Sequence, residues 1–307
     1  MATPPPPVNL WTVLSESKRI INAHSRHFLA LSVLFLLPNS FCIALYPSVS
    51  RLITDQQRPR VTPDFKTVIL LSIAYLVVVT VFNLLAIGSI AHSIFQGFYG
   101  RPVKLMSAVK SSLSSFLPLL ATLISVNSIV FGIFFILAFA AFLLKTLIEI
   151  IIPGLEISFL VFAVIIAIVV MLKFQVDWIL SCVIVVVESV WGLKALKRSK
   201  SLTKGMRRVS FSILFFFAAT SLPIGWISTT AASIPIEDGR LLTIVFFVLQ
   251  IVIVSAFQTF IMMYNVAATT VMYMYCKDFH GEVGKYVSLP FDDDDGKPLH
   301  HLAYNNV

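Results

Sequence analysis

Residues 188–213 read ESVWGLKALKRSKSLTKGMRRVSFSI, and here a very apolar run gives way to seven basic residues within fifteen positions. At about 100° per residue, one stripe of a helix through this stretch is mainly apolar, and the opposite face carries most of the charge. The stripe consists of Trp191, Ala195, Ser199, Leu202, Met206, Val209 and Ile213. The basic residues are Lys194, Lys197, Arg198, Lys200, Lys204, Arg207 and Arg208. Such a helix between two apolar runs is expected to lie along a membrane surface, with its lysines toward anionic lipid of the cytoplasmic leaflet.

The composition of the chain is that of an integral membrane protein. Of its 307 residues 58% are apolar and only 12% are charged, and the mean hydropathy is +0.91. A soluble domain usually has about 25% charged residues, so this chain has too little polar surface to cover a soluble globule. Because alternating ten-residue segments are lacking, the predicted fold class is all-α, a polytopic membrane protein with cytoplasmic interfacial amphipathic helices. The three cysteines are widely separated and predict neither a metal site nor a disulfide framework.

Six apolar runs are long enough to cross the roughly 30 Å hydrocarbon core of a bilayer. They cover residues 28–45, 67–95, 117–144, 157–190, 211–231 and 241–275. The fourth run would form a helix of about 50 Å, so we expect it to tilt, break or protrude.

Three of these spans follow a shorter amphipathic segment, at residues 12–28, 104–116 and 191–213. This pattern predicts three modules of about 11–98, 103–190 and 191–276, each an interfacial helix followed by a transmembrane hairpin. Four consecutive prolines make residues 1–10 a predicted disordered tip. Residues 277–307, with four consecutive Asp, are a predicted polar cytoplasmic tail.

The distribution of Lys and Arg predicts the orientation. With both termini cytoplasmic, the cytoplasmic segments hold sixteen basic residues and the opposite segments hold six. The expected location is an endomembrane, such as the endoplasmic reticulum, or the plasma membrane. Since this topology accounts for the net charge of +8, the expected partners are membrane lipids, anionic ones on the cytoplasmic leaflet, and nucleic acid is not expected.

The basic stretch also carries a motif, E-x-x-x-G-L-x-A-L-x-R-S-x-x-L-x-K-G. Its positions are Glu188, Gly192, Leu193, Ala195, Leu196, Arg198, Ser199, Leu202, Lys204 and Gly205. The motif resembles one in a family of uncharacterised six-span plant membrane proteins, and the stretch TTVMYMYCK at 269–277 resembles that family's closing segment. More distantly, the chain resembles the membrane domain fused to some bacterial glycerophosphoryl diester phosphodiesterases. The resemblance implies a membrane fold and no enzymatic activity, because the bacterial catalytic domain has no counterpart in this chain.

Several polar residues within apolar runs are candidate site residues. Lys173 and Asp177 lie four apart in the fourth run, where an ionisable pair is either part of an ion path or an intrahelical salt bridge near an interface. Glu188 is either a relay carboxylate or a partner of a basic residue such as Arg198.

In the last run, Gln250, Gln258 and Asn265 are spaced by eight and seven, which places them near one helix face. They either line a polar pathway or join helices by hydrogen bonds. Cys276, at the expected cytoplasmic end of this run, is either a palmitoylation site or an inert thiol.

No catalytic, cofactor or metal-binding motif is visible, so the sequence favours a non-enzymatic membrane protein without cofactors that acts through lipid and protein contacts. The alternative is a small secondary transporter or channel subunit that uses Lys173, Asp177 and the Gln/Asn face. A water-filled cavity that reaches Lys173 is the observation that would separate these hypotheses.

Overall fold

The computed structural model describes residues 8–54, 65–151, 159–231 and 241–282, and the regular structure in these ranges is helical. Ten α-helices and one π-helical turn (η1) are described. In chain order they are α1 (Leu10–Ala23), α2 (Ser25–Leu31), η1 (Ser32–Leu36), α3 (Leu37–Thr54), α4 (Phe65–Phe98), α5 (Leu105–Ile151), α6 (Phe159–Trp178), α7 (Ser181–Glu188), α8 (Leu193–Leu202), α9 (Arg207–Ala231) and α10 (Leu241–Phe279).

Six segments of the described chain are long and apolar enough to cross a membrane. They are Ser25–Ser50, Val68–Phe98, Leu105–Ile148, Val164–Glu188, Arg207–Thr230 and Val245–Phe279. The expected all-α, six-span polytopic fold is thereby confirmed. Large exposed side chains along these helices, such as Phe135, Leu222 and Phe246, are the surface that lipid chains would cover.

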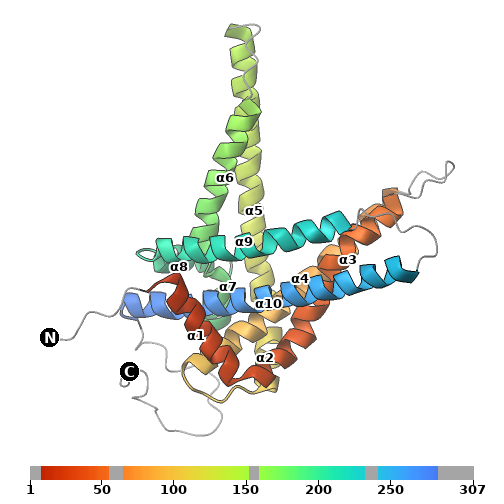
Figure 1. Cartoon of the computed structure of the whole chain (residues 1–307). Coiled ribbons are helices and arrows are strands. Elements are labelled where there is room, and N and C mark those ends of the chain that lie inside the picture. Colours follow the sequence, from red (N-terminus) through yellow and green to blue (C-terminus); the bar gives the residue numbers. More distant parts are fainter. Residues whose placement is uncertain (1–7, 55–64, 152–158, 232–240, 283–307) are drawn as a thin grey trace.

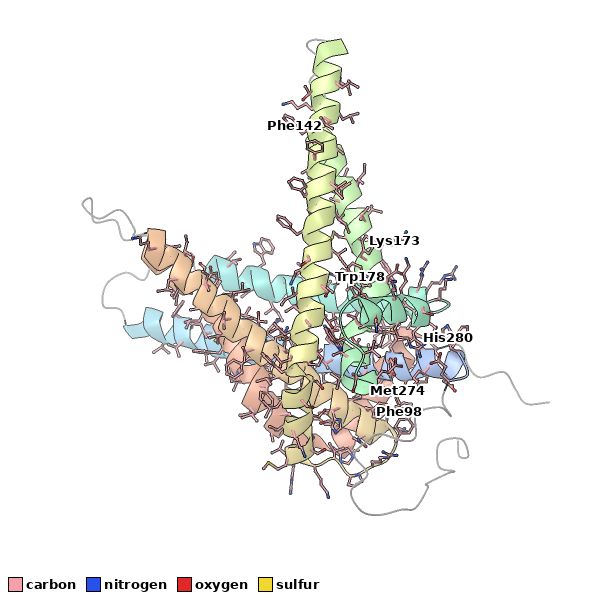
Figure 2. All side chains as sticks on the ribbon, turned by 180° about the vertical axis from the view of Figure 1, so that it is seen from behind. Phe98, Phe142, Lys173, Trp178, Met274 and His280 are labelled. Carbon is pink, nitrogen blue, oxygen red and sulfur yellow. The ribbon has the colours of Figure 1, made fainter. Side chains whose placement is uncertain are left out.

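The spans form two arms that diverge from one shared region (Figure 1). The α5–α6 hairpin is one arm and stands away from the rest, whereas α9 and α10 run side by side across the molecule and α3 and α4 cross them at an angle. Helix α5 has 47 residues and is therefore about 70 Å long, more than twice the hydrocarbon thickness. The part of α5 around Phe142 lies far along the arm (Figure 2).

The buried core lies where the two arms join. Helix α5 approaches α4 closely at Gly88, where an added Cβ would lie 3.0 Å from Ser112 Cα, and the Ser112 hydroxyl donates to the Leu85 carbonyl at 2.6 Å. Helix α1 packs against α4 and α10 and buries Val13 and Ile20 there. Small residues at the α4–α5 contact allow the backbones to come together, as in membrane helix pairs generally.

Two expectations about the interfacial helices are wrong. Residues 104–116 do not form a separate helix, because they are the first turns of α5, where Ala108 and Ser112 are buried and Ser112 bonds to Leu85 of α4. The apolar side of α1 faces the protein and not the headgroup region, since Val13, Ser17 and Ile20 are buried.

The long fourth run breaks, which was one of the expected alternatives, because α6 ends at Trp178 and α7 begins at Ser181. The expected tip 1–10 and tail 277–307 lie mainly outside the described residues. Where they are described, they differ from the prediction, because Leu10 already belongs to α1 and α10 continues to Phe279.

Candidate functional site

Five polar side chains connect α7, α8 and the end of α10, and we call them the Glu188 cluster: Glu188, Arg198, Tyr273, Lys277 and Glu282. The Tyr273 hydroxyl donates to Glu188 Oε1 at 2.8 Å, and Arg198 Nε donates to Glu188 Oε2 at 3.2 Å. Arg198 Nη1 donates to Glu282 Oε1 at 3.1 Å, and Lys277 Nζ lies 4.0 Å from Glu188 Oε1. The pairing of Glu188 with Arg198 expected as one alternative is therefore present.

The charges of the Glu188 cluster balance, with two carboxylates against two cations. The Glu188 side chain is only 6% exposed, so its charge depends on these partners and not on water. Hydrogen bonding to Glu282 raises the pKa of Arg198, and the same hydrogen bond lowers the pKa of Glu282. A carboxylate held by a tyrosine and an arginine is suited to joining helices, and it has little freedom to relay protons.

Two backbone conformations bring α8 against the cluster. Ser189 has φ 54°, and Gly192 has φ 64° with ψ −141°, a region open essentially to glycine alone. The Gly192 N–H donates to Thr122 Oγ1 on α5 at 2.9 Å, and the Ser199 hydroxyl donates to the Asp177 carbonyl at 2.8 Å. The chain thus reverses after α7 and packs α8 between α5 and α6.

The single amphipathic helix predicted over residues 191–213 is wrong. Helix α8 ends at Leu202, and α9 begins at Arg207 after a turn in which Gly205 has φ 98°. An added Cβ at Gly205 would lie 2.7 Å from Phe279 Cε1, so the turn also packs closely on the end of α10. The helical periodicity of the sequence continues through the turn, and for that reason the break was not visible in it.

The apolar stripe of this stretch is packed inside the protein. Its buried members are Ala195, Ser199, Leu202, Met206 and Ile213, while Trp191 is 62% exposed. They are covered by the neighbouring helices and so are not available to the headgroup boundary. The basic face has the opposite environment, because six of its seven side chains are exposed: Lys194, Lys197, Lys200, Lys204, Arg207 and Arg208. The seventh, Arg198, is partly buried in the Glu188 cluster.

Asp177 does not form the expected intrahelical pair with Lys173. Its carboxylate is 3% exposed, and its Oδ1 lies 3.2 Å from Arg207 Nη2 in an ion pair that joins the end of α6 to the first residue of α9. Lys173, one turn earlier, is exposed on the part of α6 that approaches α8 and α9 (Figure 2). Asp177 therefore pairs with an arginine from another helix and not with Lys173, its neighbour one turn earlier on α6.

An open groove of about 610 Å³ lies at the corner where the end of α6 meets the beginning of α9. Its polar lining consists of Lys173, Asp177, Arg207, Arg208 and Ser212, and the rest of its wall is apolar. The volume is in the range of ligand sites in proteins. The groove therefore does reach Lys173, and it combines basic side chains with an apolar surface.

The Gln/Asn face of α10 is not a common polar surface. Gln250 donates to the Ile227 carbonyl at 3.3 Å and so joins α10 to α9, Gln258 is partly buried, and Asn265 is exposed. The cavity beside Gln250 has a volume of about 10 Å³, room for about one water molecule. Thr259 of α10 makes a polar contact with α3, because its hydroxyl donates to Ser40 Oγ at 3.0 Å.

The palmitoylation alternative for Cys276 is contradicted by its position. The side chain is fully buried, and its Sγ lies 3.6 Å from Met206 Sδ in the turn before α9. A thiol packed in this way is out of reach of an acyl donor. Across the described ranges, no three His, Cys, Asp or Glu side chains are grouped as metal ligands.

Tyr273, Lys277 and Glu282 are site residues that sequence reasoning missed. Tyr273 was part of the quoted segment 269–277, but its role depends on a partner 85 positions away. The sequence did contain a signal, because each of the two motif segments carries polar residues that need partners. The first segment has Glu188 and Arg198, and the second has Tyr273 and Lys277, four positions apart. Gly192 and Gly205 of the motif now have a physical explanation in their positive φ angles.

Neither a curated protein nor a solved structure matches this chain. The profile of the domain of unknown function DUF8558 matches residues 54–289, which include α4 to α10 and every member of the Glu188 cluster. Because the match covers more than half of the chain, the protein belongs to the DUF8558 family.

Proposed function

We propose that this protein is a non-enzymatic, multi-pass membrane protein that binds anionic lipid of the cytoplasmic leaflet through the exposed basic face of α8 and the beginning of α9. The observation that supports the proposal is the division of this stretch into two environments. Its apolar residues are already packed against the protein, whereas six of its Lys and Arg side chains are exposed.

The position of this basic face fits a membrane-surface role. It lies between the spans Val164–Glu188 and Arg207–Thr230, so it is held within reach of the headgroups on one side of the membrane. Each basic residue near an anionic leaflet contributes about 1 kcal/mol of attraction, reduced by salt screening. In contrast to our expectation from the sequence, the interaction is electrostatic without insertion of an apolar helix face.

The test uses the full chain in nanodiscs of phosphatidylcholine with a minor fraction of phosphatidylglycerol. Spin-labelled forms of both lipids report which one is enriched at the protein surface. We expect enrichment of phosphatidylglycerol that decreases with added salt and with the triple variant Lys194→Gln, Lys197→Gln, Lys200→Gln. The matched control is Lys66→Gln with Lys145→Gln, exposed lysines on α4 and α5 outside this face. Equal enrichment in the triple variant and the control would disprove the proposal.

A small transporter or channel subunit is a second candidate, because the groove between α6 and α9 reaches Lys173. Its wall is largely apolar and it is open along the side of the molecule, which suits an amphiphile better than a hydrated path. Ion flux through proteoliposomes containing the full chain, compared with the Lys173→Gln variant, tests this candidate.

A further inference from the structure

The groove between α6 and α9 has the chemical layout of a site for one amphiphile. Four apolar side chains contribute to its wall, namely Val169, Leu172 and Val176 from α6 and Phe211 from α9. Charged side chains come from the last two turns of α6 and the first turn of α9. A ligand that fills it must offer an apolar part and a charged part together.

The charge of the groove favours an anion. Three basic side chains and one carboxylate line it, and the carboxylate of Asp177 is already paired with Arg207. Lys173 and Arg208 remain exposed, and they are contributed by two different helices. A phosphodiester group placed between them would contact the guanidinium of Arg208 and the ammonium of Lys173. Proteins commonly use these two groups to bind phosphate oxygens.

The apolar wall continues into the surface that faces lipid chains. On α6 the groove residue Val169 is followed toward the helix start by exposed Ile168 and Ile165, and on α9 Phe211 is followed by exposed Phe215. The two helices diverge from this corner into separate arms (Figure 1), so acyl chains could extend between them without leaving the bilayer. This continuity favours a membrane lipid over a soluble phosphate compound.

We propose that this groove binds one anionic glycerophospholipid, with its headgroup phosphate at Lys173 and Arg208 and an acyl chain along Val169, Leu172 and Phe211. The inference deepens the proposed function, since it adds a stoichiometric site to a diffuse electrostatic surface. The groove shares Arg208 with the exposed basic face but does not use the α8 lysines, so variants of these lysines and of Lys173 let the two claims fail separately.

The experiment is native mass spectrometry of the full chain in detergent, titrated with phosphatidylglycerol and, separately, with phosphatidylcholine. We expect one tightly retained phosphatidylglycerol per chain. In the variant Lys173→Gln, Arg208→Gln its dissociation constant should increase about thirtyfold, because each basic residue accounts for about a factor of five. Leu172→Gln should weaken both lipids, and the unfolding temperature without lipid checks that the variants fold.

Three control measurements determine the interpretation. The triple variant Lys194→Gln, Lys197→Gln, Lys200→Gln should retain the tight lipid, even where it abolishes surface enrichment in nanodiscs. If this triple variant loses the tight lipid and the groove variant keeps it, the groove proposal is overturned while the surface proposal stands. Displacement of the lipid by millimolar inorganic phosphate, or equal retention of phosphatidylcholine, would also overturn it, because the site would then not recognise an anionic lipid.

Discussion

Glu188 is the residue on which the packing of α7, α8 and α10 depends most directly, because Arg198, Tyr273 and Lys277 all approach its carboxylate. Removing one partner of a buried ion pair leaves an uncompensated charge at a cost of about 3–5 kcal/mol. We expect Glu188→Ala to lower the free energy of unfolding by about 3 kcal/mol, since Arg198 keeps Glu282 as a partner.

The comparison variant is Tyr273→Phe, which removes one hydrogen bond and should cost about 1 kcal/mol. Both values can be measured by denaturant unfolding in detergent micelles, followed by tryptophan fluorescence. If the two variants were equally mild, the cluster would be an incidental surface contact.

Glu282 gives the Glu188 cluster a dependence on pH. The hydrogen bond from Arg198 lowers the pKa of Glu282 below that of an unfolded glutamate, which is about 4.3. A depressed pKa means that this contribution to stability is present above the unfolded value and is lost as the pH falls through the folded one. We expect the unfolding temperature of the natural protein to decrease in this acidic range, and that of Glu282→Gln to decrease less. The control is Glu16→Gln, because the partner of Glu16, Arg19, is exposed; a parallel decrease in all three proteins would contradict the assignment.

At the scale of elements, the position of α8 depends on the backbone at Gly192. Its φ of 64° and ψ of −141° are strained for any other residue by about 1–3 kcal/mol. An added Cβ would only meet Ser125 Oγ at 3.7 Å, an ordinary contact, so the cost of Gly192→Ala is a backbone cost. We expect this variant to be destabilised by about 2 kcal/mol in thermal unfolding.

Gly225, within α9, is the matched control for Gly192. An added Cβ there would meet no atom within 4 Å. Since alanine is the better helix former, Gly225→Ala should be neutral or stabilising by up to about 1 kcal/mol. Equal destabilisation at both positions would show that the conformation of Gly192 does not matter.

At the scale of the whole molecule, six crossings of the membrane would place both termini on the same side. The C-terminal ends of α4, α7 and α10 gather in one region, while the helices diverge from it into the two arms (Figure 1). The count of basic residues predicts that the gathered ends are cytoplasmic.

We therefore expect tags on either terminus to be digested by protease added to sealed, cytoplasmic-side-out microsomes. A tag in the region 232–240, between α9 and α10, should be protected until detergent is added. A protected N-terminal tag with a digested C-terminal tag would mean an odd number of spans and would contradict this topology.

The sequence by itself determined the class of the fold and the approximate positions of the six helices that are long and apolar enough to cross a membrane. Runs of apolar residues have to be helical in a bilayer, because every backbone polar group must be satisfied within the segment. The same local reasoning predicted that the run 157–190 would tilt, break or protrude, and Pro, Gly and charge marked most of the span ends.

Only the tertiary structure decided what the polar and amphipathic residues do. Asp177 pairs with Arg207, 30 positions away, and not with its helical neighbour Lys173, and Glu188 meets Tyr273 across an even longer stretch of chain. The apolar stripe of residues 191–213 could have faced lipid or protein, since both environments satisfy the same periodicity. A buried charge takes the best partner that the fold brings near it, and helix packing, which depends on shape across distant segments, determines which partner that is.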